Sequence, residues 1–422
     1  MKKVSFFFST LLFVLVIGSV ESRAANRRIV VRNEISWNVM NIYAYNADKT
    51  VKPAGEWPGK AMTLIGSDGT YNWYEYFLDD SYDYTLIFNK TDEQTYDVSF
   101  SKDFGDKVFF VGYWNDHANS SMVDLTYKFV KTDGSDAISL TGSDCVYTGI
   151  FDASVLESDA YYALAPSYAL NDNANTIKYW SLVYRPNNNG ADYAINSFIN
   201  YSDGMTASDK VWKLSQVNAK FDLTFDVKNK TFSFNPYIEK TIGAYEYSSF
   251  SSDYAFATPE GVTAYYASAA SSKSVTLSPV TNGVPAGQGV ILNGTANETV
   301  KLTPATTTDD LSNNQLVAVK NGAAIPASTE GSFTYVFAYQ NDDLGFFKLT
   351  SSVNATADMA YLQTSEDISN AKVVFGFDEE ATGIESIENT KADNAIYNLN
   401  GVRVDNPTKG IFIQNGKKVI IK

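Results

Sequence analysis

Three large aromatic side chains surround one turn-rich stretch of the sequence. Tyr43 and Tyr45 stand two residues apart in the run WNVMNIYAYN, and Trp57 opens a Trp-Pro-Gly turn after a spacer rich in turn residues. Flat aromatic rings contact the apolar C–H faces of a sugar ring, and neutral polar side chains hydrogen-bond the hydroxyl groups around its rim. These three residues are therefore candidates for a shallow wall that binds a sugar.

Strand alternation decides which of these side chains reach solvent. In an extended strand, Tyr43 and Tyr45 share one face, and Ile42 and Ala44 share the other. The aliphatic face is the better candidate for the core, because tyrosine hydroxyls need hydrogen-bond partners or water. From the residues alone, core aromatics of an ordinary β-sandwich remain the alternative to a binding wall.

Polar side chains follow in the stretch LIFNKTDEQTYDV. Asn89, Gln94 and Thr95 fall on a predicted hairpin tip. Amide and hydroxyl groups both donate and accept hydrogen bonds, as the hydroxyl rim of a sugar requires. We therefore expect these three side chains to contribute to the same site.

The ordered set YAYNADKTVKPAGEWPGKAM, WYEYFL, LIFN and EQTYDV resembles the family 26 starch-binding modules, which are small β-sandwiches found beside amylases. The resemblance covers roughly residues 35–105. It implies that Tyr43, Tyr45 and Trp57 cradle an α-glucan and that Gln94 helps to hold it, and it favours a binding wall over core aromatics. The second strand aromatic is often tryptophan in that family and is tyrosine here, which implies weaker stacking.

The rest of the chain has the same β character. It holds 28 tyrosines and 26 phenylalanines among 422 residues, in short runs such as KFDLTFDV and FTYVFAY between clusters of Asn, Asp, Gly and Ser. Long segments of helical period are missing. This pattern predicts an all-β fold of several tandem β-sandwich (Ig-like) domains with a small C-terminal β module.

Turn clusters and changes in composition divide the chain. The cluster KTDGSD marks the first boundary, and Pro236 is expected to break the chain near the second. The predicted segments are a signal peptide at 1–24, a starch-binding sandwich at 26–130, a second sandwich that is a candidate for glycan binding at 131–238, an accessory β domain at 243–380, a linker at 381–390 and a C-terminal sorting-like β segment at 391–422.

Two further resemblances concern the later segments. The strands WKLSQVNAKFDLTFDVKNKTFSF resemble the close of sandwich modules in outer-membrane starch-capture proteins. Trp180 and Trp212 are the candidates for a second glycan site there, with a core position as the alternative. The tail KGIFIQNGKKVIIK resembles the C-terminal sorting domain of type IX secretion cargo, with a final hairpin of the preceding domain as the alternative.

The beginning of the sequence predicts export. Lys2 and Lys3 precede the apolar run FFFSTLLFVLVIGSV, and small residues follow up to Ala24, as in a secretory signal peptide. A retained membrane anchor is the alternative. No cysteine stands at the expected cleavage site after the run, so a lipoprotein is not expected. The single cysteine, Cys145, is expected to be buried and inert. We expect a protein secreted or held on the outer face of a Gram-negative outer membrane, with outer-membrane or secretion-machinery partners.

Composition argues against several classes of function. The formal net charge of −15 disfavours nucleic acid as a partner, and a single histidine, His117, excludes a histidine-based triad or a multi-histidine metal site. No Gly-rich phosphate loop or EF-hand loop occurs. We expect a monomer, not an enzyme, that needs no cofactor or metal and binds starch and maltooligosaccharides. The alternatives are a surface adhesion protein that binds protein or host glycans, and a glycosidase whose two carboxylates the sequence does not reveal.

Overall fold

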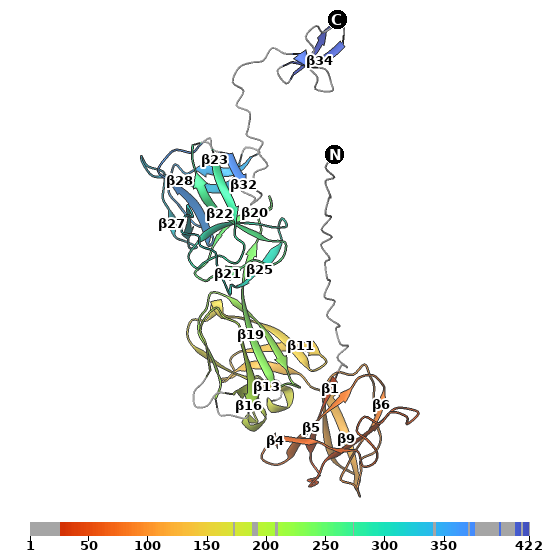
Figure 1. The fold of residues 1–422 in the computed structure, drawn as a ribbon. Helices are drawn as coiled ribbons and strands as arrows, with labels where there is room; N and C mark the ends of the chain where they lie inside the picture. Colours follow the sequence, from red (N-terminus) through yellow and green to blue (C-terminus); the bar gives the residue numbers. More distant parts are fainter. Residues whose placement is uncertain are drawn as a thin grey trace, which may run out of the picture. The chain divides into compact units, whose positions relative to one another are not determined.

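The structure is a computed structural model. It describes residues 26–171, 174–187, 193–206, 210–272, 274–340, 343–369, 372–375, 396–397, 410–414 and 417–421. The predicted signal peptide at 1–24 and the linker at 381–390 lie outside these residues. Regular structure in the described part is strand apart from three short 3-10 turns, which confirms the all-β prediction (Figure 1). In these residues no helix has the length and apolarity needed to cross a bilayer.

The first β-sandwich has two sheets. The larger sheet consists, in spatial order, of β4 (Thr63–Ser67), β5 (Asn72–Asp79), β1 (Asn26–Asn33), β8 (Lys107–Trp114) and β9 (His117–Asp124). The smaller sheet consists of β3 (Lys60–Ala61), β2 (Asn41–Tyr45), β6 (Tyr84–Asn89) and β7 (Val98–Phe100). Strand β1 is central in the larger sheet, antiparallel to β5 and parallel to β8.

Apolar side chains from both sheets form the core of this sandwich. Ile29 of β1 and Phe109 of β8 pack with Ile42 and Ala44 of β2 and with Phe88 of β6, and all five are fully buried. The inward residues of β2 are therefore the aliphatic ones, as alternation predicts. The tyrosines of the same strand are left on the outer face of the smaller sheet.

The second sandwich is built on a sheet of twelve strands. The main path consists of β14 (Arg185–Pro186), β16 (Tyr201–Thr206), β19 (Thr231–Thr241), β18 (Lys220–Asp226), β12 (Val146–Asp152), β11 (Ala137–Ser143), β10 (Tyr127–Lys131), β13 (Ala160–Pro166), β17 (Trp212–Leu214) and β15 (Tyr193–Ile195). Off this path, β25 (Thr299–Pro304) pairs with β19 and with β21 (Phe256–Ala257). The short turns are η1 (Ala153–Val155), η2 (Ser167–Ala169) and η3 (Trp180–Leu182).

Two predicted features of the domain boundaries are wrong in detail. Strand β10 pairs with β11 and β13, so it lies in the second sandwich, although the predicted boundary between 130 and 131 cuts through it. Pro236 does not break the chain, because it lies within β19 and pairs with Phe221. On the other side of β19, β16 pairs up to Phe234 and β25 pairs from Ile238 onward. Pro236 falls between these two partners, where a missing N–H removes no bond from either ladder.

The third part of the chain carries three more sheets. Its five-stranded sheet consists of β20 (Tyr247–Ser251), β24 (Gly289–Asn293), β22 (Thr263–Ala270), β23 (Ser274–Pro279) and β32 (Lys372–Phe375). Its four-stranded sheet consists of β26 (Leu316–Val319), β31 (Met359–Thr364), β28 (Phe333–Gln340) and β29 (Asp343–Lys348), and β27 (Ala324–Ile325) pairs with β30 (Val353–Asn354). A separate unit, 375–422, contains β33 (Ile396–Tyr397), β34 (Gly410–Gln414) and β35 (Lys417–Ile421).

A buried polar cluster joins the first two sandwiches, which belong to one compact unit. Arg28 of β1 is fully buried, and its guanidinium binds the Glu75 carboxylate at 2.8 Å and donates to the Tyr127 hydroxyl at 3.0 Å. The Arg28 backbone N–H donates to Asp106, which also accepts from the Tyr147 hydroxyl at 2.6 Å. Burial raises the pKa of Asp106, and these two hydrogen bonds oppose the rise. The contact between the sandwiches thus contains a specific polar cluster beside apolar packing, in which the Trp73 ring stacks on that of Tyr168 with their centroids 4.5 Å apart.

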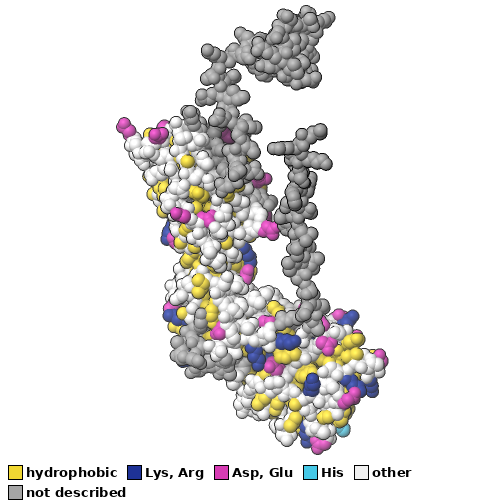
Figure 2. Space-filling model, viewed as in Figure 1, with side chains coloured by type: hydrophobic (Ala, Val, Ile, Leu, Met, Phe, Trp, Pro, Cys, Tyr) yellow, Lys and Arg dark blue, Asp and Glu magenta, His cyan; other side chains and the backbone are white. Residues whose placement is uncertain are grey.

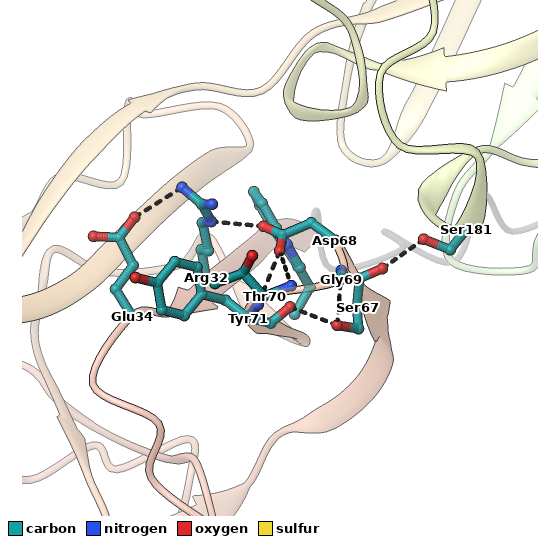
Figure 3. Close-up of polar contacts among 9 residues, drawn as sticks. Arg32, Glu34, Ser67, Asp68, Gly69, Thr70, Tyr71 and Ser181 are labelled. Atoms are coloured by element: carbon teal, nitrogen blue, oxygen red, sulfur yellow. Dashed lines mark hydrogen bonds and ion pairs between the residues drawn. The ribbon is translucent and has the colours of Figure 1, made fainter.

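The turn between β4 and β5 makes a second contact with the second sandwich. Asp68 accepts from the backbone N–H groups of Tyr71 and Thr70 and from the Arg32 guanidinium (Figure 3). Although burial acts against it, the two backbone hydrogen bonds and Arg32 hold the pKa of Asp68 below its usual value. The turn is therefore well ordered where its Ser67 carbonyl accepts from the Ser181 hydroxyl of η3 (Figure 3).

Candidate functional site

Three aromatic rings form an angled wall on the first sandwich. Tyr43 and Tyr45 are partly exposed on the outer face of β2, and Trp57 is 41% exposed in the loop that leads to β3. The centroid of the Tyr43 ring lies 5.5 Å from that of Tyr45, at 42°, and 5.5 Å from that of Trp57, at 81°. We call this set the aromatic cradle. The structure thus brings together the three aromatics that the sequence singled out.

The loop that carries Trp57 is fixed by a buried asparagine. Asn89 is fully buried at the end of β6, and its side-chain amide donates to the Pro58 carbonyl at 2.9 Å. Its side-chain oxygen accepts from the amide of Asn41 at 3.2 Å and from the backbone of Thr91 at 3.1 Å. Asn89 therefore positions Trp57 relative to β2.

Two of the three predicted rim residues do not face solvent. The side chain of Asn89 is buried and forms its hydrogen bonds within the protein. Thr95 is also buried, and its hydroxyl accepts a hydrogen bond from the Phe88 backbone N–H at 3.1 Å. The prediction that both bind a ligand is wrong, because the loop backbone beside them needs hydrogen-bond partners. Their role is to hold the site in shape.

Gln94 is the rim residue that remains available. It is exposed, and its backbone pairs with Asn89, so it lies next to the residue that holds the Trp57 loop. Among the described residues, none makes a hydrogen bond to its side-chain amide. The structure therefore leaves both polar functions of the Gln94 side chain open, next to the residue that holds the Trp57 loop.

Charged residues that the sequence analysis did not single out border Tyr45. Its hydroxyl donates to the Asp97 carboxylate at 3.0 Å, and the Lys49 ammonium lies 5.0 Å from the centroid of its ring. Partial burial and the hydrogen bond to Asp97 raise the pKa of Tyr45 above its usual value. Sequence spacing gives no sign of this pair, because Asp97 comes from a different strand connection.

The two candidate residues for a second site differ in exposure. Trp212 is fully buried in β17, where its ring packs against Phe232 at 5.0 Å and Phe129 at 5.8 Å. Its place as a glycan-binding residue is therefore corrected to a core position. Trp180 is 39% exposed at the start of η3, where the Arg185 guanidinium lies 5.8 Å from its ring.

The remaining chemistry of the described residues is sparse. Cys145 is buried, as predicted, and burial raises the pKa of its thiol, so the reactive thiolate is disfavoured. Within the described ranges no group of three or more His, Cys, Asp or Glu side chains is placed to hold a metal ion. The expectations of no cofactor, no metal and no catalysis stay predictions.

An all-β sandwich with an exposed aromatic cradle is typical of a carbohydrate-binding domain. The comparison with known families points to the same class. Residues 29–100 match the family described as Starch-binding module 26. The resemblance seen in residues 35–105 is thereby confirmed. The match does not reach the second sandwich or the C-terminal segment, whose resemblances stay predictions.

One similar solved structure is the crystal structure of CBMbc (family CBM26) from Eubacterium rectale Amy13K in complex with maltoheptaose. It is 18% identical, and the match covers 48% of this chain and 80% of that chain with a TM-score of 0.21. No curated protein matches the chain.

Proposed function

We propose that this protein binds starch and other α-1,4-glucans through the aromatic cradle. The observation that carries the proposal is the angled arrangement of Tyr43, Tyr45 and Trp57 at the surface. The match of residues 29–100 to Starch-binding module 26 supports the choice of ligand. Contact with the apolar faces of a bound sugar would explain why these three rings are exposed to solvent and not buried in the core.

The shape of the cradle suits a curved polymer. α-1,4-Glucan curves along its length, and rings inclined at 42° and 81° present faces in different directions to successive sugar units. Gln94 supplies a donor and an acceptor for sugar hydroxyls beside these rings. A shallow site of this kind is expected to bind maltooligosaccharides with a Kd of about 10 µM to 1 mM.

Electrophoresis of the full chain in a native gel that contains amylopectin tests the proposal. We expect the protein to migrate more slowly than in a gel without polysaccharide, while a protein of similar charge that binds no glucan is unaffected. A gel that contains dextran controls for viscosity and for the linkage, because dextran has an α-1,6 backbone. Equal migration in all three gels would refute binding to starch.

We propose further that the chain acts without catalysis and outside the cell. The aromatic cradle is open, and retention of starch for separate enzymes needs no more than binding. Delivery would use the predicted signal peptide at 1–24 and the C-terminal segment at 391–422, and surface exposure rather than lipid attachment would place the module near polysaccharide. Fractionation of the native host tests this location, and recovery of the protein in the cytosol would contradict it.

A pair of glycines in the Trp57 loop gives a matched test of loop geometry. Gly59 has φ +85, and a Cβ there would lie 2.0 Å from the Ile42 carbonyl oxygen, so Gly59→Ala must displace the loop. Gly55 has φ +82, and a Cβ added there would have no atom within 4 Å. Gly55→Ala therefore costs only the backbone strain of a positive φ, about 1–2 kcal/mol. We expect Gly59→Ala to weaken maltoheptaose binding about tenfold and Gly55→Ala by less than about twofold, measured by calorimetry. Equal affinities would show that the loop need not be held on β2.

A further inference from the structure

A second concave surface lies beside the aromatic cradle. It is lined by Gln94, Thr95, Tyr96 and Asp97, which precede β7, and by His117 and Ala118 at the start of β9. The groove therefore lies where the edge of the smaller sheet meets the edge of the larger one. We call it the Tyr96 groove. The chain's histidine, coloured cyan, is visible at the surface (Figure 2).

Two exposed rings line this groove, and a third lies on the hairpin next to it. Tyr96 is 57% exposed, and its ring centroid lies 5.9 Å from that of His117, at 58°. His117 pairs across the β8–β9 hairpin with Trp114, which at 67% is the most exposed of the six tryptophans. Directly paired residues of an antiparallel ladder have neighbouring side chains. Tyr96 and His117 thus form a second pair of neighbouring rings on the same sandwich, and Trp114 lies next to His117 at the tip of the β8–β9 hairpin.

The Tyr96 groove is continuous with the cradle through two residues. Asp97 lines the groove and accepts from the hydroxyl of Tyr45, a member of the cradle, at 3.0 Å. Gln94 lines the groove and is paired through its backbone with Asn89, which holds the Trp57 loop. A ligand that leaves the cradle over Tyr45 therefore meets the wall of the groove next.

The polar groups of the groove are suited to neutral hydroxyl-rich ligands. The Asp97 carboxylate uses Oδ2 for Tyr45, and its Oδ1 accepts no hydrogen bond from the described residues. The Gln94 amide is likewise open in the described part of the chain. A carboxylate and an amide beside exposed rings match the rim and the face of a sugar.

We propose that the Tyr96 groove extends the glucan site, so that a chain held in the aromatic cradle continues past Asp97 and rests further sugar units on Tyr96, His117 and Trp114. This proposal rests on the proposed function. The extended site gives the protein a preference for long oligosaccharides, because only a glucan longer than the cradle also contacts the groove. Short oligosaccharides are held by the aromatic cradle and Gln94 without contact to Tyr96, His117 or Trp114.

Calorimetry with maltotriose and maltoheptaose on the full chain tests the extension. We expect the unmodified protein to bind maltoheptaose about tenfold more tightly than maltotriose. Tyr96→Ala should weaken maltoheptaose binding about fivefold to tenfold and leave maltotriose binding within about twofold, and Trp114→Ala should have the same pattern. All these side chains are exposed, so the melting temperature should not change.

Tyr82 provides the matched control. It is 45% exposed on the connection between β5 and β6 of the same sandwich, and Tyr82→Ala should leave both affinities unchanged. Equal affinity of the Tyr96→Ala variant and the unmodified protein for maltoheptaose would overturn the extension. A parallel loss for maltotriose would also overturn it, because Tyr96 would then belong to the cradle. If the unmodified protein bound neither sugar, the proposed function would fail and the extension with it.

Discussion

Replacement of Trp57 by alanine should weaken binding to amylopectin and maltoheptaose about 10- to 100-fold. Trp57 provides one side of the aromatic cradle, with its ring centroid 5.5 Å from that of Tyr43, so its loss leaves a bound sugar without one of its apolar contacts. Removal of a large apolar contact from a binding site costs about 1.5–3 kcal/mol, which corresponds to this range. Calorimetry with maltoheptaose and native gels with amylopectin measure the effect.

The fold should survive this substitution. Trp57 is 41% exposed, and the neighbouring Pro58 carbonyl keeps its hydrogen bond to Asn89. A melting temperature within about 1 °C of the unmodified protein is therefore expected. Trp180→Ala is the matched control, because this tryptophan is 39% exposed but lies on the second sandwich. Unchanged binding by the Trp57→Ala variant would refute the cradle, and a loss in the Trp180→Ala variant would identify a second site.

The cradle was predictable because its determinants are local. Alternation along five residues places Tyr43 and Tyr45 opposite Ile42 and Ala44, and the structure buries the aliphatic pair. Trp57 stands in a Trp-Pro-Gly turn, where a bulky ring has little core to enter. Local patterns of this kind also predicted the all-β class, since short alternating runs suit half-buried strands.

The roles of Asn89 and Thr95 were not predictable in the same way. Their side chains look suited to a sugar rim, but in the structure they bind the Pro58 carbonyl and the Phe88 amide. The fold of the β6–β7 connection decides which backbone groups lack a hydrogen-bond partner. Residue types alone do not reveal this. The Tyr96 groove was missed for a related reason, because Tyr96 and His117 meet only through the pairing of distant strands.

Boundaries and buried charges depend most on the tertiary fold. Strand β10 continues the apolar pattern of the first sandwich, and only its pairing with β11 and β13 places it in the second. Arg28 would be expected at a surface, since arginine is seldom fully buried without a partner. Its partners Glu75 and Tyr127 lie 47 and 99 residues away in sequence, beyond the reach of any local pattern.

Replacement of Arg28 by methionine should destabilise the protein by about 3 kcal/mol. Removal of one partner from a buried ion pair leaves the other charge without compensation, at a typical cost of about 3–5 kcal/mol. The lower figure is expected here, because Lys230 still lies 3.5 Å from the Glu75 carboxylate. If the first two sandwiches, about 200 residues, unfold together, this corresponds to a fall in melting temperature of about 6–12 °C, measured by differential scanning calorimetry.

Two further variants separate the ion pair from packing. Lys213→Met removes one partner of a surface pair, in which Lys213 lies 2.6 Å from Asp159, and should cost no more than about 1 kcal/mol. The double variant Arg28→Met with Glu75→Leu replaces both buried charges by apolar groups and should recover much of the lost stability. If Arg28→Met melted like the unmodified protein, the contact between the first two sandwiches would not depend on Arg28. If the double variant were no more stable than the single one, shape rather than charge would explain the loss.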